Sequence, residues 1–266
     1  MSSHRNLVTV DLDATTEESA AEAALIADGV LDALARSGTT ATFFASRKIA
    51  ETSPALASRI SNAGHEVGCL THSQPARSRP YSREFSHELE VTRSAIEDAT
   101  GVRVRGHRNA HFAVDYASEW AYDVLVDQGF EYDSSRIPPR HVELGYQPVP
   151  RSVHAVRRWG GTLLEVPVST TDVLAMRMRL GTTGSVRGIP LAVWGALVEA
   201  RQERGEPLVM HLRASELRRQ SPFRRQAPAV DRRTLERMSG IVGRFPFTSV
   251  AKALPELLRN AQVIES

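Results

Sequence analysis

Asp11 and Asp13 stand directly after an apolar segment near the start of the chain, with one leucine between them. Residues 7–10 read Leu-Val-Thr-Val, a short run rich in β-branched residues that predicts a buried strand. The two carboxyl groups then lie at the carboxyl end of that strand, where ligands bind in parallel α/β folds. Two carboxylates at one edge repel each other unless a cation, a proton or hydrogen bonds compensate. The pair therefore indicates a metal or acid–base site, and the alternative is that one acid caps the following helix.

His211 is the second group that could do chemistry. It follows the apolar residues Leu208, Val209 and Met210, so a late strand is expected to present it at the same edge as Asp11. A carboxylate and an imidazole at one edge could serve as a proton acceptor and a proton donor in general acid–base catalysis. The alternative is a buried histidine with a purely structural hydrogen bond.

Strands and helices alternate along most of the chain and would position these groups. Helical spacing of apolar residues predicts helices over residues 17–37, 54–63, 82–100, 116–128, 191–204, 231–243 and 251–260. Strands are predicted for the opening apolar segment and over residues 39–45, 65–70, 102–106, 130–133, 163–168, 207–212 and 247–250. Irregular structure is expected over residues 138–158, 176–188 and 215–230, the last as a candidate lid. The alternation predicts an α/β fold, one barrel-like domain of parallel strands and crossover helices.

The composition limits the classes of protein to be considered. With 266 residues, 41% of them apolar and 24% charged, the chain fits a single globular domain over residues 1–266. The net charge of +2 does not indicate a nucleic-acid-binding surface, which needs clustered basic residues. A single cysteine, Cys69, excludes an internal disulfide framework. The absence of a signal-like leader and of a long apolar span predicts a cytoplasmic protein without membrane spans.

Seven short motifs occur in a fixed order along the chain: VTVDLD at residues 8–13, GTTATFF at 38–44, GHEVG at 64–68, VRGHR at 104–108, FEYDSS at 130–135, LEVP at 164–167 and MHL at 210–212. In this order the chain resembles the polysaccharide deacetylases, which are the NodB-homology enzymes of carbohydrate esterase family 4, and above all their exopolysaccharide-associated branch. The resemblance implies a distorted (β/α) barrel of about seven parallel strands. It also implies a bacterial hydrolase that cleaves a C–N bond, the amide of an N-acylated sugar or related metabolite, with the help of a divalent metal, often zinc.

The resemblance also implies roles for single residues. Asp11 takes the position of the general base, His211 that of the general acid, and Arg108 that of a residue orienting the base. Asp13 takes the position of a metal ligand. Further candidates, for contact with the carbohydrate substrate, are residues that flank these positions in the sequence or lie in the matching motifs: His107, His111, Tyr132 and Arg213.

The chain departs from the family at the metal-binding motif. The two histidines of the family's His-x-x-x-His motif fall on Leu70 and Gln74. Leucine has no donor atom, and an amide oxygen is a poor zinc ligand. His72 lies between the two lost positions, so a rebuilt zinc site would use Asp13 and His72 with one of the histidines that flank Arg108.

Three functions remain open on the sequence. A deacetylase-like hydrolase with an atypical or absent metal is the expected one. A metal-free isomerase or lyase could use Asp11, Arg108 and His211 for proton transfer, because a bound anion can be stabilised by a guanidinium or by backbone donors. A non-catalytic glycan-binding pseudoenzyme is the third, although a pure binder has no need of both an acid and a base.

Overall fold

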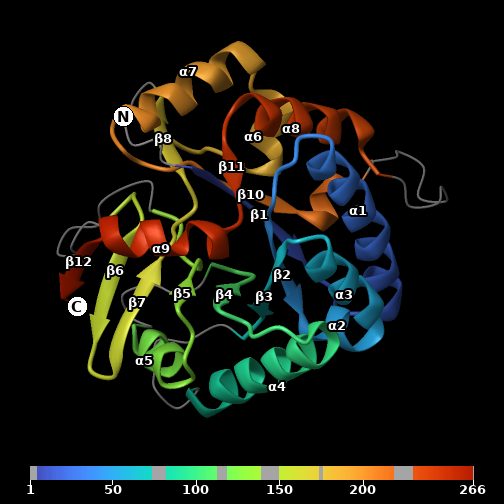
Figure 1. Ribbon diagram of the computed structural model, residues 1–266, viewed down its shortest axis with the longest axis vertical. Coiled ribbons are helices and arrows are strands. Elements are labelled where there is room, and N and C mark those ends of the chain that lie inside the picture. Colours follow the sequence, from blue (N-terminus) through green and yellow to red (C-terminus); the bar gives the residue numbers. More distant parts are fainter. Residues whose placement is uncertain are drawn as a thin grey trace.

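One hydrogen-bonded sheet positions the candidate residues. The computed structural model describes residues 5–73, 82–112, 119–138, 150–173, 176–218 and 230–265. The strand order along the main path of the sheet is β10-β1-β2-β3-β4-β5-β7-β6-β12, and β11 pairs with β1 (Figure 1). The strands of this sheet are β1 (Asn6–Leu12), β2 (Thr42–Ser46), β3 (Glu66–Thr71), β4 (Gly106–Asn109), β5 (Tyr132–Asp133), β6 (His154–Arg158), β7 (Gly161–Glu165), β10 (Val209–Arg213), β11 (Phe247–Thr248) and β12 (Gln262–Glu265).

The seven strands from β10 to β7 pair in parallel, which confirms the α/β fold and the number of parallel strands expected from the sequence. Among the described residues no pairing joins β10 to the other end of the path, so the sheet is an open and distorted form of the (β/α) barrel. A separate hairpin consists of β8 (Thr170–Val173) and β9 (Met176–Arg179).

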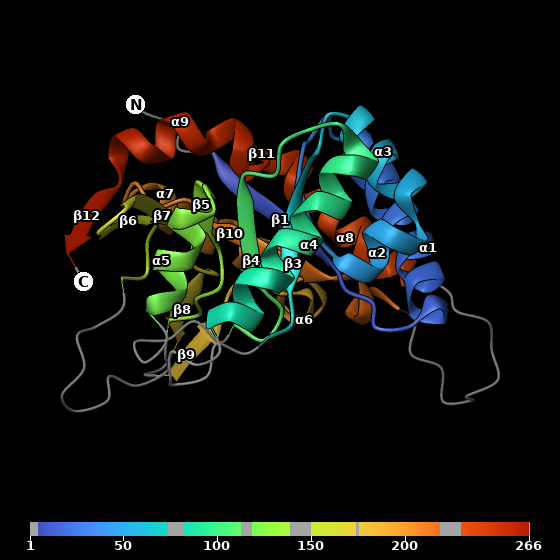
Figure 2. The ribbon, with the colours of Figure 1, turned by 90° about the horizontal axis from the view of Figure 1, so that it is seen from below.

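Helices cover both sides of this sheet. They are α1 (Glu17–Ala35), α2 (Arg47–Thr52), α3 (Pro54–Asn62), α4 (Ser82–Thr100), α5 (Trp120–Asp127), α6 (Thr183–Gly188), α7 (Leu191–Gln202), α8 (Arg232–Arg244) and α9 (Val250–Asn260), with a short 3₁₀ helix at Ala214–Leu217. Figures 1 and 2 show α1, α2, α3 and α4 gathered at one side of the molecule, and α9 apart from them. In the described part of the chain, no helix is both long and apolar enough to cross a bilayer.

Alternate residues of β1 face two different hydrophobic cores, because side chains alternate across a strand. Val8, Val10 and Leu12 pack in the larger core, which contains the buried face of α1. Leu7 packs in a smaller core with residues of β2, β3, β5, β7, β10 and α9. Thr9 and Asp11 lie on the same face of β1 as Leu7. The smaller core therefore lies beneath the two polar residues at the carboxyl end of this face.

Three elements lie where the sequence pattern predicts irregular structure. Strand β6 falls within residues 138–158, and its pairing with β7 buries Ala155 and Val156. Strand β9 and helix α6 fall within residues 176–188, where Thr182 caps α6 by accepting a hydrogen bond from the Ser185 amide. These elements are too short for a periodic signal, since a run of four to six residues spans less than two helical turns. Of the candidate lid over 215–230, residues 219–229 lie outside the described part of the chain.

Candidate active site

Asp11, Arg108 and His211 come together at the carboxyl ends of β1, β4 and β10. The Oδ1 atom of Asp11 accepts a hydrogen bond from Nη1 of Arg108 at 2.9 Å, and its Oδ2 lies 2.8 Å from Nε2 of His211. All three side chains are buried, with exposed fractions of 2%, 0% and 5% respectively. The sequence-based prediction that positions 11 and 211 meet at one edge is confirmed, and Arg108 joins them from the far side of β2 and β3.

Arg108 is held in place by more than its ion pair with Asp11. Its Nη1 also donates to Oγ1 of Thr9 at 2.8 Å, its Nε donates to the Ser134 carbonyl at 3.0 Å, and its Nη2 donates to Oγ of Ser134 at 2.6 Å. The ring of Phe44 lies under the guanidinium, 4.3 Å from Cζ to the ring centroid. A buried guanidinium needs such partners because an unpaired buried charge is costly. Arg108 is therefore a fixed cation that orients Asp11.

The charge states follow from burial and from these neighbours. Burial alone would raise the pKa of Asp11, but the charges of His211 and Arg108 and their hydrogen bonds hold it well below its usual value of 3.8. Burial is the largest influence on His211 and lowers its pKa below 6.5, against the opposite effect of Asp11. At neutral pH the pair is therefore a carboxylate and a neutral imidazole. Because a carboxylate can only accept, Nε2 of His211 carries the proton and Nδ1 keeps its lone pair.

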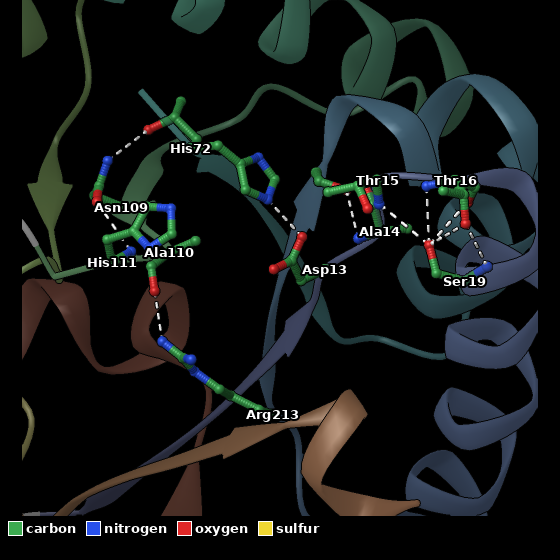
Figure 3. Close-up of polar contacts among 12 residues, drawn as sticks. Asp13, Ala14, Thr15, Thr16, Ser19, His72, Asn109, Ala110, His111 and Arg213 are labelled. Atoms are coloured by element: carbon green, nitrogen blue, oxygen red, sulfur yellow. Dashed lines mark hydrogen bonds and ion pairs between the residues drawn. The ribbon is translucent and has the colours of Figure 1, made fainter. Parts of the chain in front are cut away.

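Asp13 and His72 form a second pair at the same edge of the sheet (Figure 3). Nε2 of His72 lies 2.5 Å from Oδ1 of Asp13. The backbone amide of His72 donates to Oε1 of Glu88 at 2.7 Å, and the amide of Ser73 donates to Oε2 of Glu88 at 2.9 Å. The ring of His111 lies 6.3 Å from the ring of His72, measured between centroids. The two predicted metal ligands are thus adjacent, and helix α4 supplies the carboxylate that fixes the loop after β3.

The described residues do not fit a three-ligand metal site. They contain no group of three or more histidine, cysteine, aspartate and glutamate side chains that could hold a metal ion. Leu70, at one of the family's ligand positions, is buried with 1% of its surface exposed. Burial raises the pKa of the Cys69 thiol, which opposes the thiolate form that binds metals. Gln74, at the other ligand position, lies outside the described residues.

Two candidate substrate contacts, His107 and Tyr132, lie inside the protein. Both are completely buried, with no exposed surface. Nδ1 of His107 lies 2.8 Å from Oδ1 of Asp133, and its Nε2 lies 2.8 Å from Oγ1 of Thr71, so both ring nitrogens are engaged within the protein. The Tyr132 ring packs on Gly106 so closely that a Cβ atom there would lie 1.9 Å from Cζ of the tyrosine. These side chains connect neighbouring strands and do not reach a surface that a substrate could touch.

The other two candidates, His111 and Arg213, lie at the open edge. His111 is exposed, and its amide donates to Oδ1 of Asn109 at 3.0 Å. The guanidinium of Arg213 donates to the Ala110 carbonyl, as Figure 3 shows. The chain thus brings Arg213 from the end of β10 against the loop that follows β4, directly beside the site.

Sequence reasoning missed the residues that support the site. Ser134 and Thr9 hold Arg108, and the spacing of Thr9 two residues before Asp11 on one strand face was the signal for its role. Phe112, whose ring lies against His211 at a centroid distance of 4.9 Å, carried no signal, since its position depends on how the loop after β4 folds.

Two family models match the chain. Residues 15–122 match the polysaccharide deacetylase family, and residues 134–255 match a domain of unknown function, DUF3473. Among curated proteins, none matches the chain at a significant level.

Solved structures of similar fold include a protein described as a polysaccharide deacetylase from Mycobacterium smegmatis. Its sequence is 16% identical, its TM-score is 0.66, and the match covers 99% of this chain and 95% of that chain. A CE4 family pseudoenzyme from Bacillus anthracis is 14% identical, with a TM-score of 0.53 over 100% of this chain and 70% of its own. A family 4 carbohydrate esterase from Streptomyces lividans is 14% identical, with a TM-score of 0.51 over 92% of this chain and 91% of its own. The chain therefore contains a region that matches the polysaccharide deacetylase family, followed by a region that matches DUF3473, and its fold is similar to that of the CE4 proteins.

Proposed function

We propose that this protein hydrolyses the amide bond of an N-acylated amino sugar, and that Asp11, Arg108 and His211 are its acid–base group. The observation that carries the proposal is the convergence of these three side chains at the carboxyl edge of a deacetylase fold. A carboxylate fixed by a buried cation, next to a neutral imidazole, is an arrangement that can transfer protons at neutral pH. The match of residues 15–122 to the polysaccharide deacetylase family supports the choice of an amide on a sugar as the bond that is cleaved.

His211 is the better general base of the pair. The pKa of Asp11 lies far below neutral pH, and both of its oxygens already accept hydrogen bonds, so it has little tendency to take another proton. The pKa of a general base is best placed near the working pH, which favours the imidazole. Asp11 then orients the ring through Nε2 and stabilises the imidazolium that forms, as the carboxylate does in other Asp–His pairs.

In the proposed reaction, the imidazole of His211 takes up one proton and later returns it. Nδ1 of His211 takes a proton from water while the water oxygen bonds to the acyl carbon. As the C–N bond breaks, the imidazolium returns that proton to the leaving nitrogen, so the products are a carboxylic acid and a free amino sugar. Arg213 and His111, at the open edge beside the site, are the residues we propose for contact with the sugar. No step passes through a metal, because the described residues do not form a metal site.

The experiment measures release of acetate and of free amine from N-acetylglucosamine oligomers, with and without EDTA. We expect His211→Ala and Asp11→Asn to lower kcat/KM on the order of 10²- to 10⁴-fold, which is the usual contribution of a general base and its partner. Trp159→Ala is the matched control, since Trp159 is fully exposed at the turn between β6 and β7. Wild-type protein without turnover, or with turnover that neither site variant changes, would contradict the proposal.

A second candidate is a glycan-binding pseudoenzyme, favoured by Leu70 at a position where the family has a metal ligand. Its test is calorimetry with the same oligomers together with the double variant Leu70→His and Gln74→His, which restores the family's motif. A pseudoenzyme would bind the oligomers without turnover, and the double variant would acquire zinc-dependent acetate release. Turnover by the wild-type protein in EDTA excludes this candidate.

A further inference from the structure

Phe112 adopts an unusual backbone conformation directly over the candidate catalytic pair. Its φ angle is +51°, and among the described residues it is the one non-glycine residue with a positive φ. A bulky residue rarely occupies this left-handed region, because its Cβ atom crowds the backbone. Such a conformation persists only where surrounding contacts hold it, and it occurs preferentially at functional sites.

In the described part of the chain, the Phe112 ring contacts residues of the site. Its ring meets the imidazole of His211 edge to face, with centroids 4.9 Å apart and planes at 80°. The guanidinium carbons of Arg108 and Arg213 each lie 5.7 Å from the centroid of the same ring. Arg213 also donates to the Ala110 carbonyl, two residues before Phe112. Arg213, at the end of β10, therefore contacts both the backbone of this loop and the ring of Phe112.

We propose that Phe112 is a positioning residue, whose ring shields the Asp11–His211 hydrogen bond from water and holds the imidazole facing the carboxylate. The proposal deepens the proposed function and rests on it for its catalytic consequence, but the packing itself can be measured without turnover. The left-handed backbone aims the ring at His211, and the two guanidiniums fix it there through the negative face of the ring. Excluding water strengthens the hydrogen bond between Asp11 and His211, and the stronger hydrogen bond keeps the imidazole of His211 from turning.

The charged groups that face His211 come from three strands: Asp11 of β1, Arg108 of β4 and Arg213 of β10. Asp11 favours the protonated imidazole, and the two arginines oppose it. Burial is the largest of the influences that lower the pKa of His211. Removing the ring of Phe112 removes part of this burial and leaves all three charges in place, so the titration midpoint of His211 should move upward.

The experiment compares Phe112→Gly with Phe112→Leu and Phe112→Tyr in the full chain. Glycine keeps the positive φ without strain and deletes the ring, leucine keeps apolar bulk without the aromatic face, and tyrosine restores the ring. The midpoint of His211 is followed by NMR of the imidazole, assigned by the signal lost in His211→Ala. We expect the midpoint to rise most in the glycine variant, less in the leucine variant, and to return to the wild-type value with tyrosine. We also expect a roughly 100-fold loss of kcat in the glycine variant, the cost of misplacing a reacting group by about 1 Å.

The outcomes separate this inference from the proposed function. An unchanged His211 midpoint in both the glycine and the leucine variant would overturn the role of Phe112, even if the wild-type protein is an active hydrolase. A raised midpoint that tyrosine restores supports the role, even if the wild-type protein hydrolyses no sugar amide and the proposed function fails. A loss of kcat that tyrosine does not rescue would contradict the positioning role.

Discussion

The Asp11–His211 pair derives its properties from a third residue, Arg108. Burial alone would favour the protonated carboxyl, but His211 and the Arg108 guanidinium, which lies 2.9 Å away, lower the pKa of Asp11 and keep it ionised. The ionised carboxylate in turn fixes which nitrogen of His211 carries the proton. Arg108 of β4 therefore helps to set the charge state of the pair, and the ionised carboxylate sets the tautomer of His211.

The rate of hydrolysis should fall in acid because His211 must be neutral to accept a proton. Its folded-state pKa lies below 6.5, so the neutral form dominates above that value and is lost as the pH falls through it. We expect log kcat/KM to be flat near neutral pH and to drop by about one unit per pH unit below the midpoint. If Asp11 were the base instead, its far lower pKa would keep the profile flat across this range.

Breaking the ion pair should cost stability as well as activity. Asp11→Asn leaves the Arg108 guanidinium buried without a counter-charge, which destabilises proteins by about 3–5 kcal/mol. The remaining partners of Arg108, Thr9 and Ser134, place the expected value at the lower end of this range. Urea unfolding measures it, and the double variant Asp11→Asn and Arg108→Met should recover part of the loss, because it removes the stranded charge. A single variant as stable as the wild type would contradict the burial of this pair.

At the scale of the elements, the long apolar and periodic segments could be predicted, and several of the short elements could not. The opening strand is a continuous apolar run, and helix α4 has apolar residues at helical spacing; α4 begins and ends at the predicted residues 82 and 100. Strand β4 was placed over residues 102–106 but runs over Gly106–Asn109, because its buried Arg108 and Asn109 are polar residues typical of loops. Their burial depends on partners from β3 and β5, which no local pattern contains.

The same limit applies to the candidate site. Asp11, Arg108 and His211 could be found because strand ends and family motifs identify them. The burial of His107 and Tyr132 could not, since it depends on hydrogen bonds and ring contacts between neighbouring strands. Buried polar residues of this kind satisfy each other across the sheet, and the sequence gives no sign that they face inward.

The close packing of β4 on β5 can be tested at Gly106. Gly106→Ala would place a Cβ atom 1.9 Å from Cζ of Tyr132, so we expect a loss of about 1–3 kcal/mol in the free energy of unfolding. Gly240→Ala, within helix α8, is the matched control, because no atom lies within 4 Å of its added Cβ. The control should gain up to about 1 kcal/mol from helix propensity. Equal stabilities of the two variants would show that Tyr132 does not occupy this position.

At the scale of the whole molecule, the site joins the two halves of the chain. Arg108 belongs to the region that matches the polysaccharide deacetylase family, and His211 belongs to the DUF3473 region. Strand β1 lies between them in the sheet, with β10 on one side and β2 on the other. One sheet thus contains strands from both regions.

The central claim is that the buried pair of Asp11 and His211 performs catalysis without the family's metal triad. Acetate release from N-acetylglucosamine oligomers in EDTA, compared between the wild-type protein and His211→Ala, tests this claim most directly. The account predicts turnover by the wild type in the chelator and its loss, on the order of 10²-fold or more, in the variant. Equal release by the two proteins, or release by the wild type only after zinc is added, would contradict it.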